Sequence, residues 1–165
     1  MPDEIVDIVD QNDVVIGQIS REEVDEQDLH TFRVVHGFLV NSQGKIWIPR
    51  RAATKKTCPN ALDYSVAGHV SSGETYDESL VRESMEELNL DLSLVPWRLL
   101  GMLMPTPDVN CFQKIYEIQT NVTPLFNPED FSEGSWWSPK EVVEMIEGGE
   151  PAKENIAVVL RKFYF

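Results

Sequence analysis

The side chains with the clearest chemical potential are three glutamates, Glu83, Glu86 and Glu87. They are spaced i, i+3 and i+4, so a helix would place them within an arc of about 100°. Like charges at these spacings repel each other by roughly 0.2–0.5 kcal/mol per pair, so the helix gains nothing from collecting them. Two interpretations follow: a solvated acidic face, or a site for a hard cation such as Mg²⁺, which prefers oxygen ligands and bridges to substrate phosphates.

The residues around these glutamates predict the helix that must position them. Thr75, followed three residues later by Glu78, has the spacing of a capping box, which predicts a helix starting near Tyr76. Asn89 can adopt the left-handed conformation that ends a helix, and residues 71–73 predict a loop before it. The predicted buried face repeats at helical spacing and comprises Leu80, Val81, Ser84, Met85 and Leu88.

The glutamates are part of a longer pattern. Its six fixed positions are Gly68, Glu74, Arg82, Glu83, Glu86 and Glu87. The spacings between them closely resemble those of the Nudix box: Gly, five residues, Glu, seven residues, Arg-Glu, two residues, Glu-Glu. The chain departs from that box at Ser84, where an apolar residue is usual, and at Asn89, which replaces a Gly. Neither departure removes a candidate metal ligand, so the resemblance favours the cation site.

The resemblance to the Nudix family implies both a fold and a reaction. The implied fold is α/β (α+β), an α/β/α sandwich with a mixed central sheet. The chain length and the lack of repeats or a linker predict a single domain over residues 1–165. The implied reaction is metal-dependent hydrolysis of a diphosphate linkage in a nucleoside diphosphate derivative or similar small organic pyrophosphate. Its implied cofactor is Mg²⁺, with Mn²⁺ as the alternative.

The same resemblance implies roles for individual residues. The implied metal ligands are the Gly68 carbonyl and the carboxylates of Glu83, Glu86 and Glu87. One of these glutamates can instead act as general base on the attacking water, and Glu86 is the first choice. Many Nudix enzymes take a further acid from a loop beyond the box. Glu129 and Glu133 are the candidates here, with solvated loop acids as the alternative.

A cluster of basic residues precedes the box. Arg50, Arg51, Lys55 and Lys56 place four cations within seven positions of a chain that has only 14 Lys and Arg. A solvated loop balancing nearby acid is one interpretation, and a phosphate-facing patch is the other. Because they adjoin the box, Arg51 and Lys55 are predicted to bind the diphosphate. His69 is a further candidate because it follows Gly68, although a lone His is more often structural.

Further stretches match a narrower pattern, comprising residues 15–17, 33–36, Asn41, Gly44, residues 50–51, Lys55, Pro59 and residues 63–70. Together they resemble the branch of the Nudix family related to type I isopentenyl diphosphate isomerase. Two alternatives to a hydrolase therefore stay open. One is the isomerase, and the other is a non-catalytic binding module that kept the fold.

Specific residues weigh against both alternatives. Ala67 stands where the isomerase has a catalytic Cys, and Phe32 stands where its metal site needs a His. Val109 and Cys111 occupy the places of its second carboxylate pair. Without these groups there is no route to protonate an alkene, so hydrolysis is favoured. An intact box disfavours the binding module, because binding alone need not preserve three clustered carboxylates.

Composition excludes several partners. The formal net charge of −14 over 165 residues argues against broad binding of nucleic-acid backbone and against docking on an anionic membrane. A small-molecule diphosphate is the expected partner, and a metal with a few placed cations would bring it to the acidic protein. Two Cys make no disulfide framework, and no targeting or transmembrane segment is apparent. The cytoplasm is therefore the expected location.

Periodicity and turn residues place the remaining elements. Expected strands cover residues 4–9, 14–19, 32–40, 45–49, 62–66, 97–103, 111–120 and 136–137, and the first four form two hairpins. Expected helices cover residues 139–147, capped by Ser138, and residues 152–163. Residues 21–29 are expected to form a loop or a short helix. Residues 104–108 and 124–135 are expected to form loops.

Overall fold

The computed structural model describes residues 4–107, 109 and 111–165. Its strands are β1 (Ile5–Val9), β2 (Val15–Ser20), β3 (Arg33–Val40), β4 (Ile46–Arg51), β5 (Val66–His69), β6 (Trp97–Leu103), β7 (Phe112–Gln119) and β8 (Phe131–Trp137). Its helices are α1 (Arg21–Glu26), α2 (Tyr76–Leu88), the 3-10 helix η1 (Leu92–Leu94), α3 (Pro139–Glu147) and α4 (Ile156–Tyr164). Within the described residues, no helix is both long and apolar enough to cross a bilayer.

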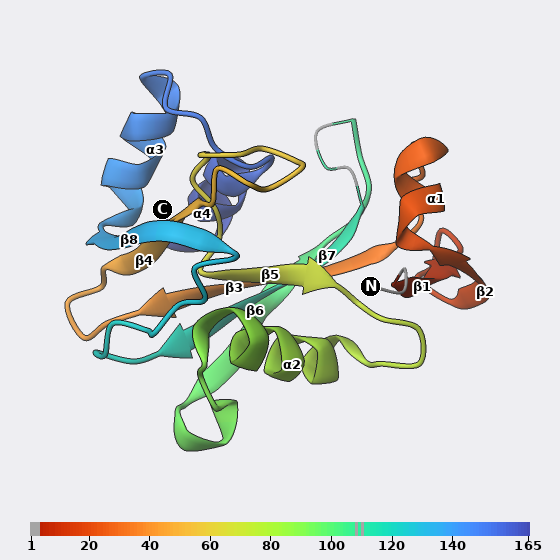
Figure 1. Ribbon diagram of the computed structural model, residues 1–165, viewed down its shortest axis with the longest axis horizontal. Coiled ribbons are helices and arrows are strands. Elements are labelled where there is room, and N and C mark those ends of the chain that lie inside the picture. The colour runs from red at the N-terminus through yellow and green to blue at the C-terminus, as the bar shows by residue number, and fades with distance from the viewer. Residues whose placement is uncertain (1–3, 108, 110) are drawn as a thin grey trace.

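The central sheet has six strands in the order β6-β7-β3-β4-β8, with β5 also paired to β3. Only β3 and β7 run parallel among the described pairs, so the sheet is mixed. Helix α2 covers one face, and α3 and α4 lie on the other (Figure 1). The predicted sandwich with a mixed central sheet is therefore confirmed.

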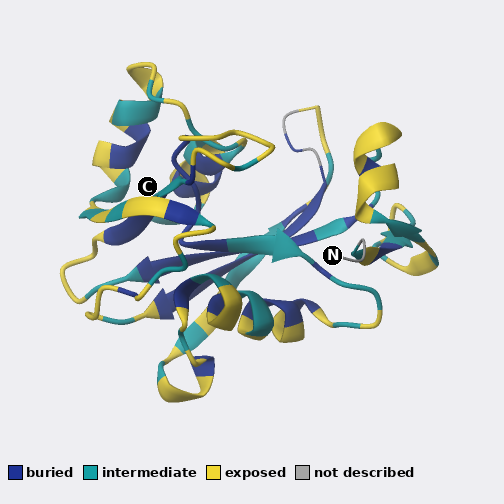
Figure 2. Ribbon diagram, in the orientation of Figure 1, coloured by how far each residue is buried: buried dark blue, intermediate teal, exposed yellow. Residues whose placement is uncertain are grey.

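Strand β3 contributes buried side chains to the hydrophobic cores on both faces of the sheet. Val35 and Leu39 are buried against the α2 side, whereas Phe38 is buried among residues of α3 and α4. Successive side chains of a strand point to opposite faces, so one apolar strand can serve both layers. Figure 2 shows buried residues along the sheet and on the inner side of α2.

The predicted N-terminal hairpin is confirmed, but it forms a separate two-stranded sheet of β1 and β2. The sequence predicts a loop or a short helix for residues 21–29, and the structure shows the short helix α1. Its capping box pairs Ser20 with Glu23. This β1–β2–α1 unit is attached to the rest of the chain through a small apolar cluster. That cluster comprises Val6, Val24, Phe32, Val34 and Cys111.

The second predicted hairpin is confirmed only near its turn. Strands β3 and β4 are paired at Val40 and Ile46, and β5 pairs with β3 further along, from Val34 with His69 to Gly37 with Val66. Strand β4 meanwhile pairs with β8 on its other side. The divergence of β3 and β4 opens the sheet at the place where β5 delivers Gly68.

Three predicted boundaries are wrong. The strand expected at residues 62–66 starts at Val66, so Gly68 lies inside β5. The loop expected at residues 124–135 ends at Asp130, because β8 pairs with β4 from Phe131 onward. The terminal helix starts at Ile156, since Asn155 adopts a left-handed conformation before it. In the expected loop 104–108, Asp108 lies outside the described residues.

The predicted inward face of α2 is partly wrong. Leu80, Ser84 and Leu88 are buried, but Val81 and Met85 are exposed. The buried residues Tyr76, Leu80, Ser84 and Leu88 recur every four residues. Because a helix has 3.6 residues per turn, this row shifts gradually around the helix axis and leaves Val81 exposed. This phase brings the glutamate face toward β5.

Candidate active site at the strand β5 and helix α2 junction

Local contacts fix the start and end of α2. The Oγ1 atom of Thr75 accepts a hydrogen bond from the Glu78 amide at 3.1 Å, which confirms the predicted capping box. Asn89 ends the helix in a left-handed conformation with φ of 51°. Its side-chain amide also donates to the Leu125 carbonyl at 2.7 Å, a contact that a Gly could not make. These two ends set the rotation of the three glutamates.

The glutamates converge on β5 from one side of α2. The Glu87 carboxylate accepts a hydrogen bond from the Ala67 amide at 2.9 Å. The Glu83 carboxylate lies so close to Gly68 that a Cβ atom built there would be 2.3 Å from Glu83 Oε1. Glu86 lies further out, with 57% of its side chain exposed. The structure therefore brings Glu83 and Glu87 to the backbone of Gly68 and Ala67 and leaves Glu86 at the edge of the site.

Arg82 supplies the countercharge within this cluster. Its guanidinium contacts Glu74 at 3.0 Å, Glu83 at 2.8 Å and Glu86 at 3.2 Å. The same group reaches the His69 carbonyl at 3.3 Å. Arg82 and Glu74 thus hold the loop and the carboxylates in place.

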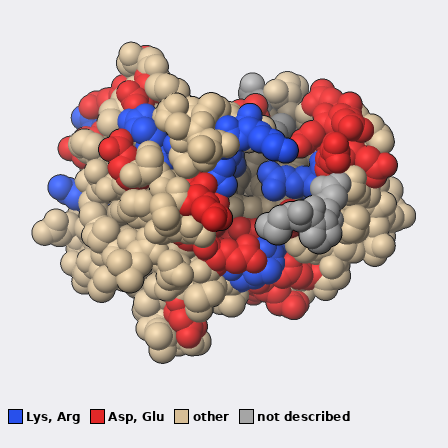
Figure 3. Space-filling view, in the orientation of Figure 1, with Lys and Arg blue, Asp and Glu red and all other residues tan. Residues whose placement is uncertain are grey.

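A cavity of about 590 Å³ opens over the glutamates. Its basic lining residues are Arg21, Arg51, Lys55, Arg82 and Lys153, and its acidic ones are Glu4, Glu83, Glu86, Glu87 and Asp130. Figure 3 shows a hollow on this face with Lys and Arg side chains above and beside it and acidic side chains beneath. Such a cavity can place a polyanion between fixed cations and a cation bound to the carboxylates.

Comparison with known proteins decides the family, because the family model of the NUDIX domain matches residues 30–159. The chain belongs to the Nudix hydrolase family. An uncharacterized Nudix hydrolase of Nostoc sp. is 51% identical over 162 residues, covering 98% of this chain and 96% of the relative. A Nudix hydrolase of Deinococcus radiodurans is 44% identical, covering 98% of this chain and 95% of the relative.

Solved Nudix structures agree with this assignment. The crystal structure of DR0079 from Deinococcus radiodurans has a TM-score of 0.94 and 43% identity, covering 98% of this chain and all of that one. The MutT protein of Methanosarcina mazei, at 17% identity and a TM-score of 0.65 over 80% of this chain and 91% of its own, shares the fold. As a Nudix hydrolase, the protein is an enzyme of the pyrophosphohydrolase type.

The Nudix box fits the divalent cation that the family uses. Burial raises the pKa of Glu83 to about 7, against the lowering effect of Arg82. Burial, and then repulsion from Glu83, raises the pKa of Glu87 well above its ordinary value. A divalent cation would relieve this repulsion and suits carboxylate and carbonyl oxygens.

The carboxylates are not yet arranged around one point. Within residues 4–107, 109 and 111–165, no group of three or more His, Cys, Asp or Glu side chains has the geometry to hold a metal. The contacts explain this, since Arg82 holds Glu83 and Glu86 while the Ala67 amide holds Glu87. The donor set fits a hard cation, and metal binding requires these side chains to turn away from Arg82.

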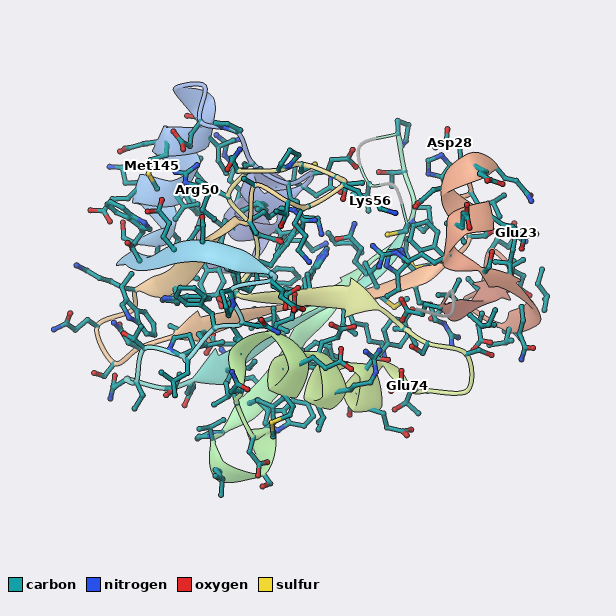
Figure 4. The ribbon with its side chains drawn as sticks, viewed as in Figure 1. Glu23, Asp28, Arg50, Lys56, Glu74 and Met145 are labelled. Atoms are coloured by element: carbon teal, nitrogen blue, oxygen red, sulfur yellow. The ribbon has the colours of Figure 1, made fainter. Side chains whose placement is uncertain are left out.

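The predicted substrate cations, Arg51 and Lys55, both line the cavity. Arg51 contacts the buried Asp63 at 2.8 Å, and Lys55 contacts Asp130 at 2.6 Å. Arg50 is turned elsewhere, toward Glu133 at 2.9 Å. Figure 4 shows Lys56 on the loop between β4 and β5, and Glu74 at the start of α2, on opposite sides of β5.

The two loop acids proposed to assist catalysis are placed differently. Neither Glu129 nor Glu133 belongs to the described residues that line the cavity, and Glu133 pairs with Arg50. The acid that this loop brings to the cavity is Asp130. The pairing of β8 with β4 from Phe131 onward sets which loop residue faces inward. Sequence reasoning could not see this pairing, so it missed Asp130.

Both histidines near the box are neutral at physiological pH. His69 stacks on Phe32 at 5.2 Å between ring centroids, and His36 stacks on Tyr64 at 3.6 Å. Burial, followed by Arg21 and Lys153, lowers the pKa of His69 to about 3. Burial and then Lys153 lower the pKa of His36 well below its ordinary value. His69 therefore lines the cavity as an uncharged ring.

Proposed function

We propose that this protein hydrolyses a diphosphate linkage in a nucleoside diphosphate derivative or similar small organic pyrophosphate, using Mg²⁺ or Mn²⁺. The observation that carries the proposal is that all three Nudix-box carboxylates line one cavity with several cations, with Glu83 beside Gly68 and Glu87 on the neighbouring Ala67 amide. The metal would be held by the Gly68 carbonyl and by Glu83 and Glu87, with Glu86 as a third ligand if it does not act as the base. When bound, it would offset phosphoryl charge and acidify a water molecule.

The remaining chemistry belongs to side chains of the chain itself. Glu86, the most exposed of the three glutamates, takes the proton of the attacking water. The water oxygen bonds to one phosphorus. The bond between that phosphorus and the bridging oxygen breaks, and the bridging oxygen leaves with the other phosphate. Glu87 is positioned by the Ala67 amide, and Glu83 lies beside Gly68, where it can turn from Arg82 toward the metal. Arg51 and Lys55 orient the diphosphate from the opposite wall.

The experiment is a panel of nucleoside diphosphate derivatives and prenyl diphosphates, incubated with the protein and Mg²⁺. The expected result is phosphate or monophosphate release from at least one member, abolished by chelation of the metal. A protein that binds members of the panel but releases no product from any of them would be a non-catalytic module.

We expect that the finer resemblance to isopentenyl diphosphate isomerase does not extend to its reaction. Ala67 lies on β5 opposite His36 and offers only its backbone amide, which Glu87 already occupies. Cys111 is buried, and burial raises the pKa of its thiol to about 12. We expect no dimethylallyl diphosphate from isopentenyl diphosphate and Mg²⁺, as followed by chromatography of the products. Efficient conversion would overturn the hydrolase assignment.

Removing either predicted substrate cation should weaken substrate binding. We expect Lys55→Gln and Arg51→Gln each to raise KM about tenfold, because hydrogen bonds to charged groups contribute roughly 1.5–3 kcal/mol. Arg51→Gln also leaves the buried Asp63 without its closest charged partner, so Arg51→Gln with Asp63→Asn is the matched control for folding. Lys56→Gln, on the same loop, should leave steady-state kinetics unchanged. Unchanged KM and kcat in both Arg51→Gln and Lys55→Gln would refute the assignment.

A further inference from the structure

A second, smaller compartment of about 270 Å³ adjoins the cavity over the Nudix box. The two compartments share one set of lining residues, which we call the neck. The neck comprises Arg21, Val34, His36, Thr57, His69 and Lys153. Any ligand that extends from the glutamates into the smaller compartment must pass these side chains.

The neck carries positive charge from two residues. His69 stacks on Phe32, and His36 stacks on Tyr64. Arg21 and Lys153 are the Lys and Arg side chains of the neck, and both line the two compartments, so both act on the same small region. Two cations beside these rings can hold an anion.

These two cations are also the least committed in the cavity. Arg51, Lys55 and Arg82 are held by carboxylates at 2.6–2.8 Å. Arg21 instead lies 3.8 Å from Glu4, with 48% of its side chain exposed. Lys153 lies 3.9 Å from Asp63, a carboxylate that Arg51 already engages at 2.8 Å. A ligand can therefore recruit Arg21 and Lys153 without breaking a short ion pair.

The two cations come from opposite ends of the chain. Arg21 is the only Lys or Arg in the first 32 residues, in a segment otherwise rich in Asp and Glu. It begins α1, which precedes residues 30–159 that match the family model. Lys153 precedes α4, and its amide is fixed to the Leu62 carbonyl at 2.8 Å. The acidic β1–β2–α1 unit thus directs its single Arg toward the cavity.

We propose that Arg21 and Lys153 form a second anion-binding subsite at the neck. It takes a phosphoryl group of the substrate other than the one held at the Nudix box. The inference rests on the proposed diphosphate hydrolysis and names two residues that would recognise the substrate. Charge-assisted hydrogen bonds from a guanidinium and an ammonium group would fix the second phosphoryl and so align the scissile linkage.

The test measures binding without turnover. Methylenediphosphonate, a non-hydrolysable diphosphate, is titrated with Mg²⁺ into wild type, Arg21→Gln, Lys153→Gln and the double variant by calorimetry. We expect each single variant to raise Kd about tenfold, the effect of losing one charge-assisted contact. The double variant should weaken binding by less than the product of the two effects, because both side chains contact one group. Arg21→Lys, which keeps the charge, should retain most of the affinity.

Two control variants distinguish a specific subsite from the general electrostatic attraction of the protein for an anion. Lys56→Gln removes a cation from the neighbouring outer groove, and Lys140→Gln removes an exposed one from α3. Both should bind the probe as wild type does. Orthophosphate should bind weakly and compete with the probe. The proposal is overturned if wild type does not bind the probe, if both neck variants bind it like wild type, or if orthophosphate binds without competing.

Kinetics distinguish this proposal from the proposed function. With a member of the panel that is hydrolysed, the neck variants should raise KM about tenfold and leave kcat within about twofold. This pattern is expected when the lost contact stabilises the bound substrate and the transition state equally. If no substrate is hydrolysed but the neck variants still bind methylenediphosphonate more weakly than wild type, the proposed hydrolysis is refuted and the proposed subsite is supported. If hydrolysis proceeds with unchanged KM in both variants, the subsite alone fails.

Discussion

Glu87→Gln should reduce hydrolysis by about a hundredfold or more, since even residues that only support a metal ligand contribute 10–100-fold to affinity or activity. The fold should survive, because the Gln side chain still offers an oxygen to the Ala67 amide. The metal-free variant should melt at a higher temperature than wild type, because a buried carboxylate whose pKa is raised well above its ordinary value is removed. The measurements are steady-state kinetics across Mg²⁺ concentrations and thermal unfolding in chelator.

Glu86→Gln is the matched variant, because Glu86 is exposed and is assigned the role of base. Loss of a general base costs about 10²–10⁴-fold in rate, so kcat should fall by that amount at saturating Mg²⁺. Glu87→Gln should chiefly raise the Mg²⁺ concentration needed for half-maximal rate. Turnover close to wild type in both variants would remove the Nudix-box glutamates from the mechanism.

Gly68→Ala should inactivate the enzyme without unfolding it. The added Cβ would lie 2.3 Å from the Cδ and Oε1 atoms of Glu83, so the carboxylate must move. Because that carboxylate is the end of a flexible side chain, the fold can accommodate the methyl group. The displaced Glu83 can no longer meet a cation beside the Gly68 carbonyl, and we expect roughly a hundredfold loss of activity, comparable to losing a supporting ligand contact.

Gly17→Ala is the control for this substitution. Gly17 lies in β2, and nothing stands within 4 Å of a Cβ built there. It should therefore leave activity and melting temperature close to those of wild type. Far-UV circular dichroism of Gly68→Ala checks that the loss is local. Normal Mg²⁺-dependent turnover in Gly68→Ala would show that Glu83 is not needed beside Gly68.

The local part of the site could be predicted from the sequence. The capping box at Thr75, the helix end at Asn89 and the spacing of the glutamates are all encoded within about one helix length. Such features depend on neighbours three or four residues away, which a pattern can reveal. The mixed sandwich followed from the family resemblance, because that resemblance extends over most of the chain.

The rest depends on contacts between distant segments. Arg21, Asp130 and Lys153 reach one cavity only after β3 and β4 diverge and β8 pairs with β4. The sequence predicts a loop for the first part of strand β8, because its exposed residues Ser132, Glu133 and Ser135 show no apolar alternation. Its strand character comes from pairing with β4, which places Gly134 against the ring of Trp47. Tertiary context overrides local preference at such positions.

The way the β1–β2–α1 unit is attached has a consequence for how the protein opens. Its apolar contact is the small cluster around Val6 and Val24, whereas the central sheet is buried between two much larger cores. Its other ties are polar, including Ser71 donating to Glu4 at 2.8 Å and Arg33 donating to Asp13 at 2.7 Å.

Segments with few buried apolar contacts unfold locally at lower free energy than the global transition. Amides of β1 and β2 should therefore exchange with deuterium sooner than those of β3 and β7. When this unit opens, Arg21 leaves with it while the Nudix box stays folded. If Arg21 binds substrate as proposed, local opening of this unit would weaken substrate binding while the glutamates of the Nudix box keep their positions.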